Sequence, residues 1–192
     1  MSDARTGAPT SKWANRFVFA AILQGLLALG LTAYLLYHAV FGQPAASRIV
    51  AGGGAGMWMT VGYLGYLTLG LVGTAVTAQM YRHLEAYLSK PFTGRSQVFP
   101  WLHLILWNVG VTGATWLMIN AGYRGGAAAI GTQFGGLGYN AGQVHTIMVA
   151  YTLWIAATMA VALAGAFLGI VGYLLVWARP AKAAIRLPVS AA

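Results

Sequence analysis

The chain contains no cysteine and only two acidic residues among its 192 positions. The lack of thiols excludes disulfides, thiolate metal sites and iron–sulfur clusters. The acidic residues are Asp3 and Glu85, and neither lies in a long apolar run. Proton pumps and cation transporters usually carry carboxylates inside the membrane, so we do not expect a self-sufficient carrier of protons or cations. A nucleophile with a base and an orienting acid cannot be assembled either, and we predict no catalytic residues.

Charge of any kind is scarce. Charged residues make up 7% of the chain and hydrophobic residues 59%, whereas soluble domains carry about 25% charged residues. Such a chain cannot cover a water-facing surface, so the lipid bilayer is its predicted surroundings. The net charge is +9, but the basic residues are spread over tails and loops. This spread argues against a nucleic-acid partner and indicates contact with anionic lipid.

The apolar runs predict an all-α protein, an integral membrane four-helix bundle. About 20 residues are needed to cross a membrane, and four runs are long enough. The first is too long for the apolar region of a signal peptide. The fourth is roughly 50 Å long at 1.5 Å per residue, so it must tilt or project from a core of about 30 Å. The predicted spans are residues 17–41, 55–81, 98–122 and 144–177.

These spans divide the chain into three regions. We expect a disordered cytoplasmic tail at 1–15, the transmembrane domain at 16–178, and a basic cytoplasmic tail at 179–192. The basic residues outside the spans alternate three, one, three, one, three along the chain. The positive-inside rule then places both termini and the 82–98 loop in the cytoplasm. We expect the loop at 122–142 to face outside, and the membrane to be the inner (cytoplasmic) membrane of a prokaryote.

The four histidines are the candidate cofactor ligands. The predicted topology places His38 and His145 near the outer ends of the first and fourth helices. It places His83 and His103 at the inner ends of the second and third. Imidazoles on two facing helices can hold a six-coordinate haem iron, so each pair is a candidate ligand set for haem b. The alternative is that these are interfacial, hydrogen-bonded side chains. His103 is the one most expected to be buried.

Other polar or small residues have simpler interpretations. Gln24 is the one strongly polar residue inside the first span, and we expect it to bond a neighbouring helix. Tyr66, Gly70, Gly73 and Thr77 recur at helical spacing and predict a face for close helix approach, as does the Gly165–Gly169 step of the fourth span. The glycine-rich segment after the third span lacks the lysine and the spacing of a phosphate-binding loop.

Three stretches and one histidine carry a family resemblance. They are 62–70 (GYLGYLTLG), 101–110 (WLHLILWNVG), 121–126 (AGYRGG) and His145 with the apolar run that follows it. Together they resemble part of subunit I of the haem-copper oxidase superfamily, closest to its nitric-oxide-reductase-like branch. The resemblance covers about 55–178 and implies a membrane protein of an electron-transfer chain.

The sequence departs from that family at its haem ligands. The family's His-x-His would fall near Met57-Trp58-Met59, where both histidines are replaced. The family's second metal site needs three further histidines, and this chain has four in total. By this resemblance the chain alone lacks the dioxygen or nitric-oxide site.

The sequence thus predicts a non-catalytic transmembrane subunit of a respiratory or other electron-transfer complex. Such a subunit would lie beside other membrane subunits, with haem b on His103 or on the outer histidine pair. The first alternative is a cofactor-free four-helix scaffold or assembly protein of a membrane complex. The second, less favoured, is a small-molecule carrier.

Overall fold

The computed structural model describes residues 11–180. Within them the chain is helical and contains no strand. Four helices are long and apolar enough to cross a membrane: Lys12–Phe41, Gly56–Tyr87, Gly94–Ala129 and Ala141–Trp177. The predicted all-α class and the four spans are confirmed at that level.

The first helix is α1 (Lys12–Phe41), and the short helix α2 (Ala46–Ala51) follows it. The second long helix consists of α3 (Gly56–Gly65), a π-helical stretch (Tyr66–Gly73), α4 (Thr74–Arg82) and a second π-helical stretch (His83–Tyr87). A 3-10 turn (Gly94–Gln97) leads into α5 (Val98–Ala129). Another (Thr132–Phe134) precedes α6 (Ala141–Trp177).

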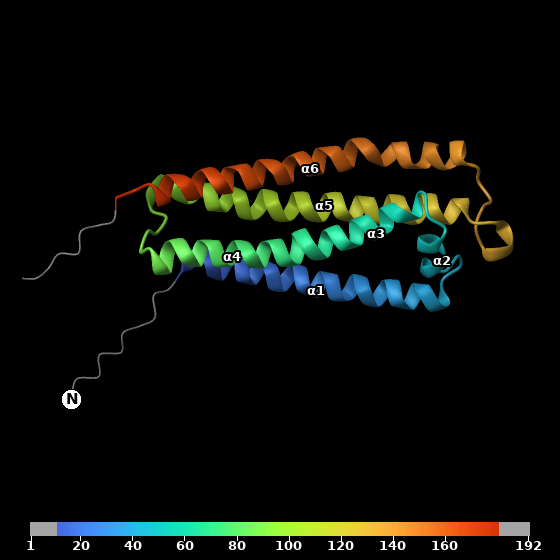
Figure 1. The fold of residues 1–192 in the computed structure, drawn as a ribbon, viewed down its shortest axis with the longest axis horizontal. Helices are drawn as coiled ribbons and strands as arrows, with labels where there is room; N and C mark the ends of the chain where they lie inside the picture. The colour runs from blue at the N-terminus through green and yellow to red at the C-terminus, as the bar shows by residue number, and fades with distance from the viewer. Residues whose placement is uncertain (1–10, 181–192) are drawn as a thin grey trace, which may run out of the picture.

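The long helices lie side by side in a bundle that is not closed (Figure 1). The most extensive interface joins α5 and α6, and α3 packs on α5. On the other side, α1 packs mainly on α4 and on the stretch 66–73. In Figure 1, α6 and α1 therefore lie at opposite edges, with the second and third long helices between them.

Both described chain ends lie at one end of the bundle (Figure 1). We call this the terminal end; it also holds the segment 88–97. The opposite end, which we call the loop end, holds α2 and the segment 130–140. This placement follows from four consecutive helices that run alternately up and down.

Glycines set the closest helix contacts. A Cβ on Gly110 would lie 2.3 Å from the backbone nitrogen of Ala162, and one on Gly165 would lie 2.6 Å from that of Trp107. The predicted glycine step of the fourth span therefore does pack on its neighbour. The close approach of α3 to α5 occurs instead at Gly122, where a Cβ would lie 2.0 Å from the backbone nitrogen of Met59, and at Gly62, where one would lie 2.6 Å from the carbonyl oxygen of Thr115. The predicted face around Gly73 meets the side chain of Trp107, not a backbone.

Two helices extend beyond the predicted spans. The first span was predicted at 17–41, and α1 already begins at Lys12, where the Ser11 side chain accepts a hydrogen bond from the backbone N–H of Ala14 and caps the helix. Residues 1–10 of the predicted tail lie outside the described residues, as do 181–192 of the C-terminal tail. The third helix continues to Ala129, so the connecting loop is 130–140 and not 122–142. Glycines are tolerated in this helix because Gly122, Gly125 and Gly126 pack against residues of 49–59 and Met148.

Glu85 explains why the N-terminal turn is ordered. Its carboxylate accepts hydrogen bonds from the Ser11 hydroxyl at 2.5 Å and from the backbone N–H of Trp13 at 3.0 Å. A negative charge at a helix N-terminus is favourable because the first N–H groups have no partner within the helix. Glu85 therefore ties the start of α1 to the end of the second long helix.

Candidate functional site

A polar network crosses the middle of the bundle. The Gln24 amide nitrogen donates to the side-chain oxygens of Asn108 at 2.9 Å and Thr112 at 3.1 Å. The Tyr66 hydroxyl donates to the Gln24 side-chain oxygen. The Thr74 hydroxyl donates to Asn108 at 3.3 Å. The prediction that Gln24 bonds a neighbouring helix is confirmed, and the network joins all of the first three long helices.

His103 lies nearer the terminal end, on α5. Its Nδ1 is 3.1 Å from the Tyr81 hydroxyl of α4. Its ring also contacts Phe17 of α1, with centroids 5.2 Å apart, and Trp107 one turn further along α5. A Cβ on Gly169 of α6 would lie 2.1 Å from Nδ1. All four long helices therefore meet around this imidazole.

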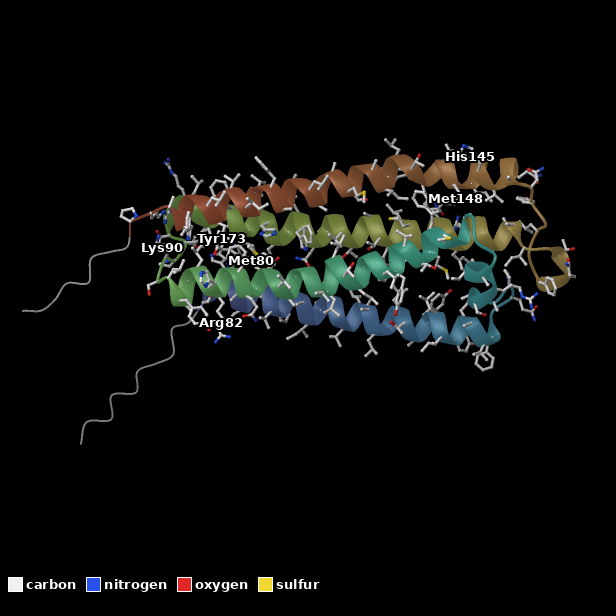
Figure 2. All side chains as sticks on the ribbon, viewed as in Figure 1. Met80, Arg82, Lys90, His145, Met148 and Tyr173 are labelled. Carbon is white, nitrogen blue, oxygen red and sulfur yellow. The ribbon has the colours of Figure 1, made fainter. Side chains whose placement is uncertain are left out.

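A cavity of about 250 Å³ adjoins His103. It lies between α4 and α6, and residues of α5 form its inner wall. Two of its lining residues, Met80 of α4 and Tyr173 of α6, are labelled in Figure 2. Met80 is 50% exposed and Ile170 is 57% exposed, so the cavity opens sideways between these helices. Its lining comprises Thr77, Met80, Tyr81, His103, Trp107, Ala166, Gly169, Ile170 and Tyr173.

The lining is neutral and largely apolar. Its polar side chains are those of His103, Tyr81, Tyr173, Thr77 and Trp107, and it contains no lysine, arginine, aspartate or glutamate. The Thr77 hydroxyl is used by its own helix, where it donates to the Gly73 carbonyl at 2.8 Å. The indole N–H of Trp107 is buried and has no hydrogen-bond partner among residues 11–180. In surroundings without water, such a group is costly to leave unsatisfied.

The second inner histidine, His83, does not face this cavity. It begins the π-helical turn after α4, is exposed, and lies 6.1 Å from the ring of Tyr87. His103 instead contacts rings of α1, α4 and its own helix. The two inner histidines, His83 and His103, therefore have different neighbours, although they lie at a similar depth along their helices.

The predicted outer histidines are also apart. His38 accepts or donates one hydrogen bond through Nε2, 3.0 Å from the Tyr123 hydroxyl of α5. His145 is exposed on α6, on the far edge from α1 in Figure 1, and Figure 2 shows it at the outer face of its helix. His145 lines a second cavity of about 520 Å³ at the loop end, with Met148, Trp58 and Tyr139 among its neighbours.

The positions of the four histidines bear on the prediction of a bound haem. His103 is the one imidazole in the lining of its cavity, so a haem there would need another kind of second ligand. The cavity volume is also below the range of about 300–1,000 Å³ that drug-sized ligands occupy. A bis-histidine haem stays a prediction. Within residues 11–180 there is also no group of three or more His, Cys, Asp or Glu that could hold a metal ion.

A basic and aromatic cluster closes the terminal end. The Arg16 guanidinium lies 4.4 Å from the ring centroid of Trp13 and 4.3 Å from that of Trp101. The two indoles are themselves 5.3 Å apart, edge to face. A cation held over indole rings is stabilised by their quadrupoles. This cluster fixes α1 to the start of α5 just below the His103 cavity.

Several site residues were not singled out from the sequence. Tyr81 was given no role, and Trp107 and Asn108 were noted only as members of the stretch 101–110. A signal did exist for Asn108 and Gln24, since both are amides at mid-span depth in different helices. No comparable signal linked Tyr81 to His103, because their contact depends on the rotation of each helix.

No protein-family model, curated protein or solved structure matched this chain in the comparisons made.

Proposed function

We propose that this chain is a non-catalytic transmembrane subunit of a respiratory or other electron-transfer complex. The observation that carries the proposal is the His103–Tyr81 pair at the wall of a sideways-open cavity. The pair lies in an apolar bundle, and Glu85 is the only acidic residue within the described residues 11–180. A hydrogen-bonded imidazole and phenol at a lipid-level cavity suit the binding of a membrane-soluble electron carrier. They do not by themselves provide an active site for bond cleavage.

We also propose that the bundle spans a prokaryotic inner membrane with its terminal end in the cytoplasm. Lys12, Arg16, Arg82, Lys90, Arg95 and Arg179 all belong to the terminal end, and Arg48 and Arg124 to the loop-end half. The positive-inside rule favours the cytoplasm for the richer end. The start of α1 and the end of α6 both lie at the terminal end, which is consistent with two chain ends on the same side of the membrane.

Haem b stays a prediction. Its best-placed ligand is His103, whose second ligand would have to be a side chain such as the Met80 thioether, since Met80 lines the same cavity. Methionine and histidine together do ligate haem in some proteins. The small cavity weighs against a macrocycle, so haem is not needed for the proposed role.

A cofactor-free scaffold is the second candidate. The observation that favours it is the engagement of His38 by Tyr123 and of His103 by Tyr81. Such hydrogen bonds are the ordinary fate of interfacial or buried histidines. A scaffold would bind partner subunits but no electron carrier.

Purification from native membranes in mild detergent tests these roles. The proposal predicts that the chain co-purifies with redox-active membrane subunits identified by mass spectrometry. The visible spectrum of the chain expressed alone, in cells supplied with haem, tests the haem separately. The absence of a Soret band would remove haem from this chain. Migration as a lone monomer would contradict both subunit roles.

A further inference from the structure

We propose that the cavity between α4 and α6 binds the ring of a quinone that enters from the lipid. This inference rests on the proposed function, since it names the class of electron carrier. Three properties of the cavity carry it: its position, its size and the hydrogen-bonding character of its wall.

The position of the cavity favours a lipid-soluble ligand. The mouth is flanked by Met80 and Ile170, which are half exposed on helices apolar enough to face lipid. The deeper wall contains Tyr81, which is 2% exposed. A ligand thus passes from the hydrocarbon between α4 and α6 toward α5.

The volume of the cavity favours a ligand with a single ring. A volume of about 250 Å³ is at the small end of ligand pockets. The walls include the aromatic side chains of Trp107 and Tyr173, against which a flat ring can stack. Gly169 and Ala166 leave the α6 side of the cavity free of bulk.

The charge and hydrogen-bonding groups of the cavity wall favour a neutral ligand that carries acceptor oxygens. When the Tyr81 hydroxyl donates to Nδ1 of His103, the imidazole carries its own proton on Nε2, which makes that nitrogen a donor. The indole N–H of Trp107 has no partner in the described chain, but the nitrogen is buried away from the cavity surface, so it is not counted as a donor to a ligand there. The lining holds no cation to attract an anion and no carboxylate to attract an ammonium group. The carbonyl oxygens of a quinone meet these requirements, whereas a lipid acyl chain offers no acceptor.

The test uses the full chain in lipid nanodiscs and a matched pair of probes. Duroquinone and durene share one ring and four methyl groups, but only duroquinone has carbonyl oxygens. Quenching of tryptophan fluorescence measures duroquinone binding, and durene is added as a competitor. We expect a saturable quenching component that durene does not displace at equal concentration. Absence of a saturable component, or equal competition by durene, would overturn the proposal.

Two variants on α6 locate the site. Ala166→Leu places bulk inside the cavity, and Ala164→Leu places the same bulk on an exposed position of the same helix. We expect Ala166→Leu to weaken duroquinone binding about tenfold or more, because the larger side chain occupies the space proposed for the ring and binding would then overpack the site. Ala164→Leu should leave binding within about twofold. Equal loss in both variants would show that quenching arises outside this cavity and would overturn the proposal. The comparison of the two probes on the unaltered chain does not depend on either variant folding.

The outcomes separate this inference from the proposed function. A chain that co-purifies with redox subunits but shows no saturable duroquinone binding keeps its subunit role and loses the quinone site. A chain that purifies alone and still binds duroquinone, with the Ala166→Leu effect, keeps the site and loses the subunit role.

Discussion

The Tyr81 hydroxyl of α4 lies 3.1 Å from Nδ1 of His103 on α5, and Gly169 of α6 lies against the same imidazole ring. Three helices thereby fix the position of one titratable ring. Tyr81 also stacks on Phe17 of α1, with ring centroids 4.9 Å apart. Tyr81 therefore takes part both in the cavity wall, through His103, and in the packing of α1 on α4 at the terminal end, through Phe17.

Tyr81→Phe removes the hydroxyl that orients His103. We expect the free energy of unfolding to fall by about 1 kcal/mol, the usual value of one such hydrogen bond. Duroquinone affinity should fall several-fold because the donor on Nε2 is no longer fixed. Unfolding in mixed micelles and the quenching titration measure the two effects. Tyr63→Phe is the matched control, since the Tyr63 hydroxyl is bonded to Thr32 at 2.8 Å, away from the cavity. A fall in duroquinone affinity of the same size in this control would contradict a specific role for Tyr81.

Gly169→Ala tests the close approach of α6 to His103. The added Cβ would lie 2.1 Å from Nδ1 and 2.5 Å from Cγ of the ring, so either the imidazole or the helix must shift. Overpacking of this kind costs about 1–3 kcal/mol, and the Tyr81–His103 hydrogen bond should be lost. Gly30→Ala on α1 is the control, because no heavy atom lies within 4 Å of its added Cβ. Equal unfolding midpoints for the two variants would show that α6 does not approach as closely as described.

Gln24→Leu removes the centre of the mid-bundle network. Asn108, Thr112 and Tyr66 would each lose a hydrogen-bond partner inside an apolar bundle. Interhelical polar contacts in membranes contribute about 1–2 kcal/mol in model peptides, so we expect a loss of that size in mixed-micelle unfolding. Leu23→Ala, which truncates an exposed neighbour, should cost less. A Gln24→Leu chain as stable as the unaltered one would mean that the network contributes no net stability.

The proposed orientation can be tested because the natural chain has no cysteine. Single substitutions Gln133→Cys and Ser89→Cys place thiols at exposed positions of the loop end and the terminal end. We expect a membrane-impermeant maleimide to label Gln133→Cys in intact spheroplasts. It should label Ser89→Cys only after permeabilisation. The reverse pattern would place the terminal end outside the cytoplasm.

Hydropathy and length were sufficient to predict four helices, because the need to bury about 20 apolar residues in lipid is a local property of sequence. The start of α1 was missed because its stabilising partner, Glu85, is distant in the chain. Its carboxylate bonds the backbone N–H of Trp13 from the second long helix. The extension of α5 to Ala129 was missed because its glycines look like a loop until their close packing partners are known.

The candidate site shows a similar division. The depth of each histidine along its helix could be predicted from the spans, but the cavity beside His103 could not. The direction in which each ring points depends on helix rotation and on which helices are neighbours. His38 faces Tyr123, and His145 lies on a helix at the opposite edge of the bundle. Depth alone therefore paired histidines that the tertiary structure separates.

The most direct test of the proposed subunit role is native mass spectrometry of the chain extracted from its own membranes in mild detergent. The proposal predicts a particle well above the 20.2 kDa of the single chain, whose dissociation releases this chain together with at least one redox-active membrane subunit. Recovery of the chain only at 20.2 kDa, or in multiples of that mass without any redox partner, would contradict it.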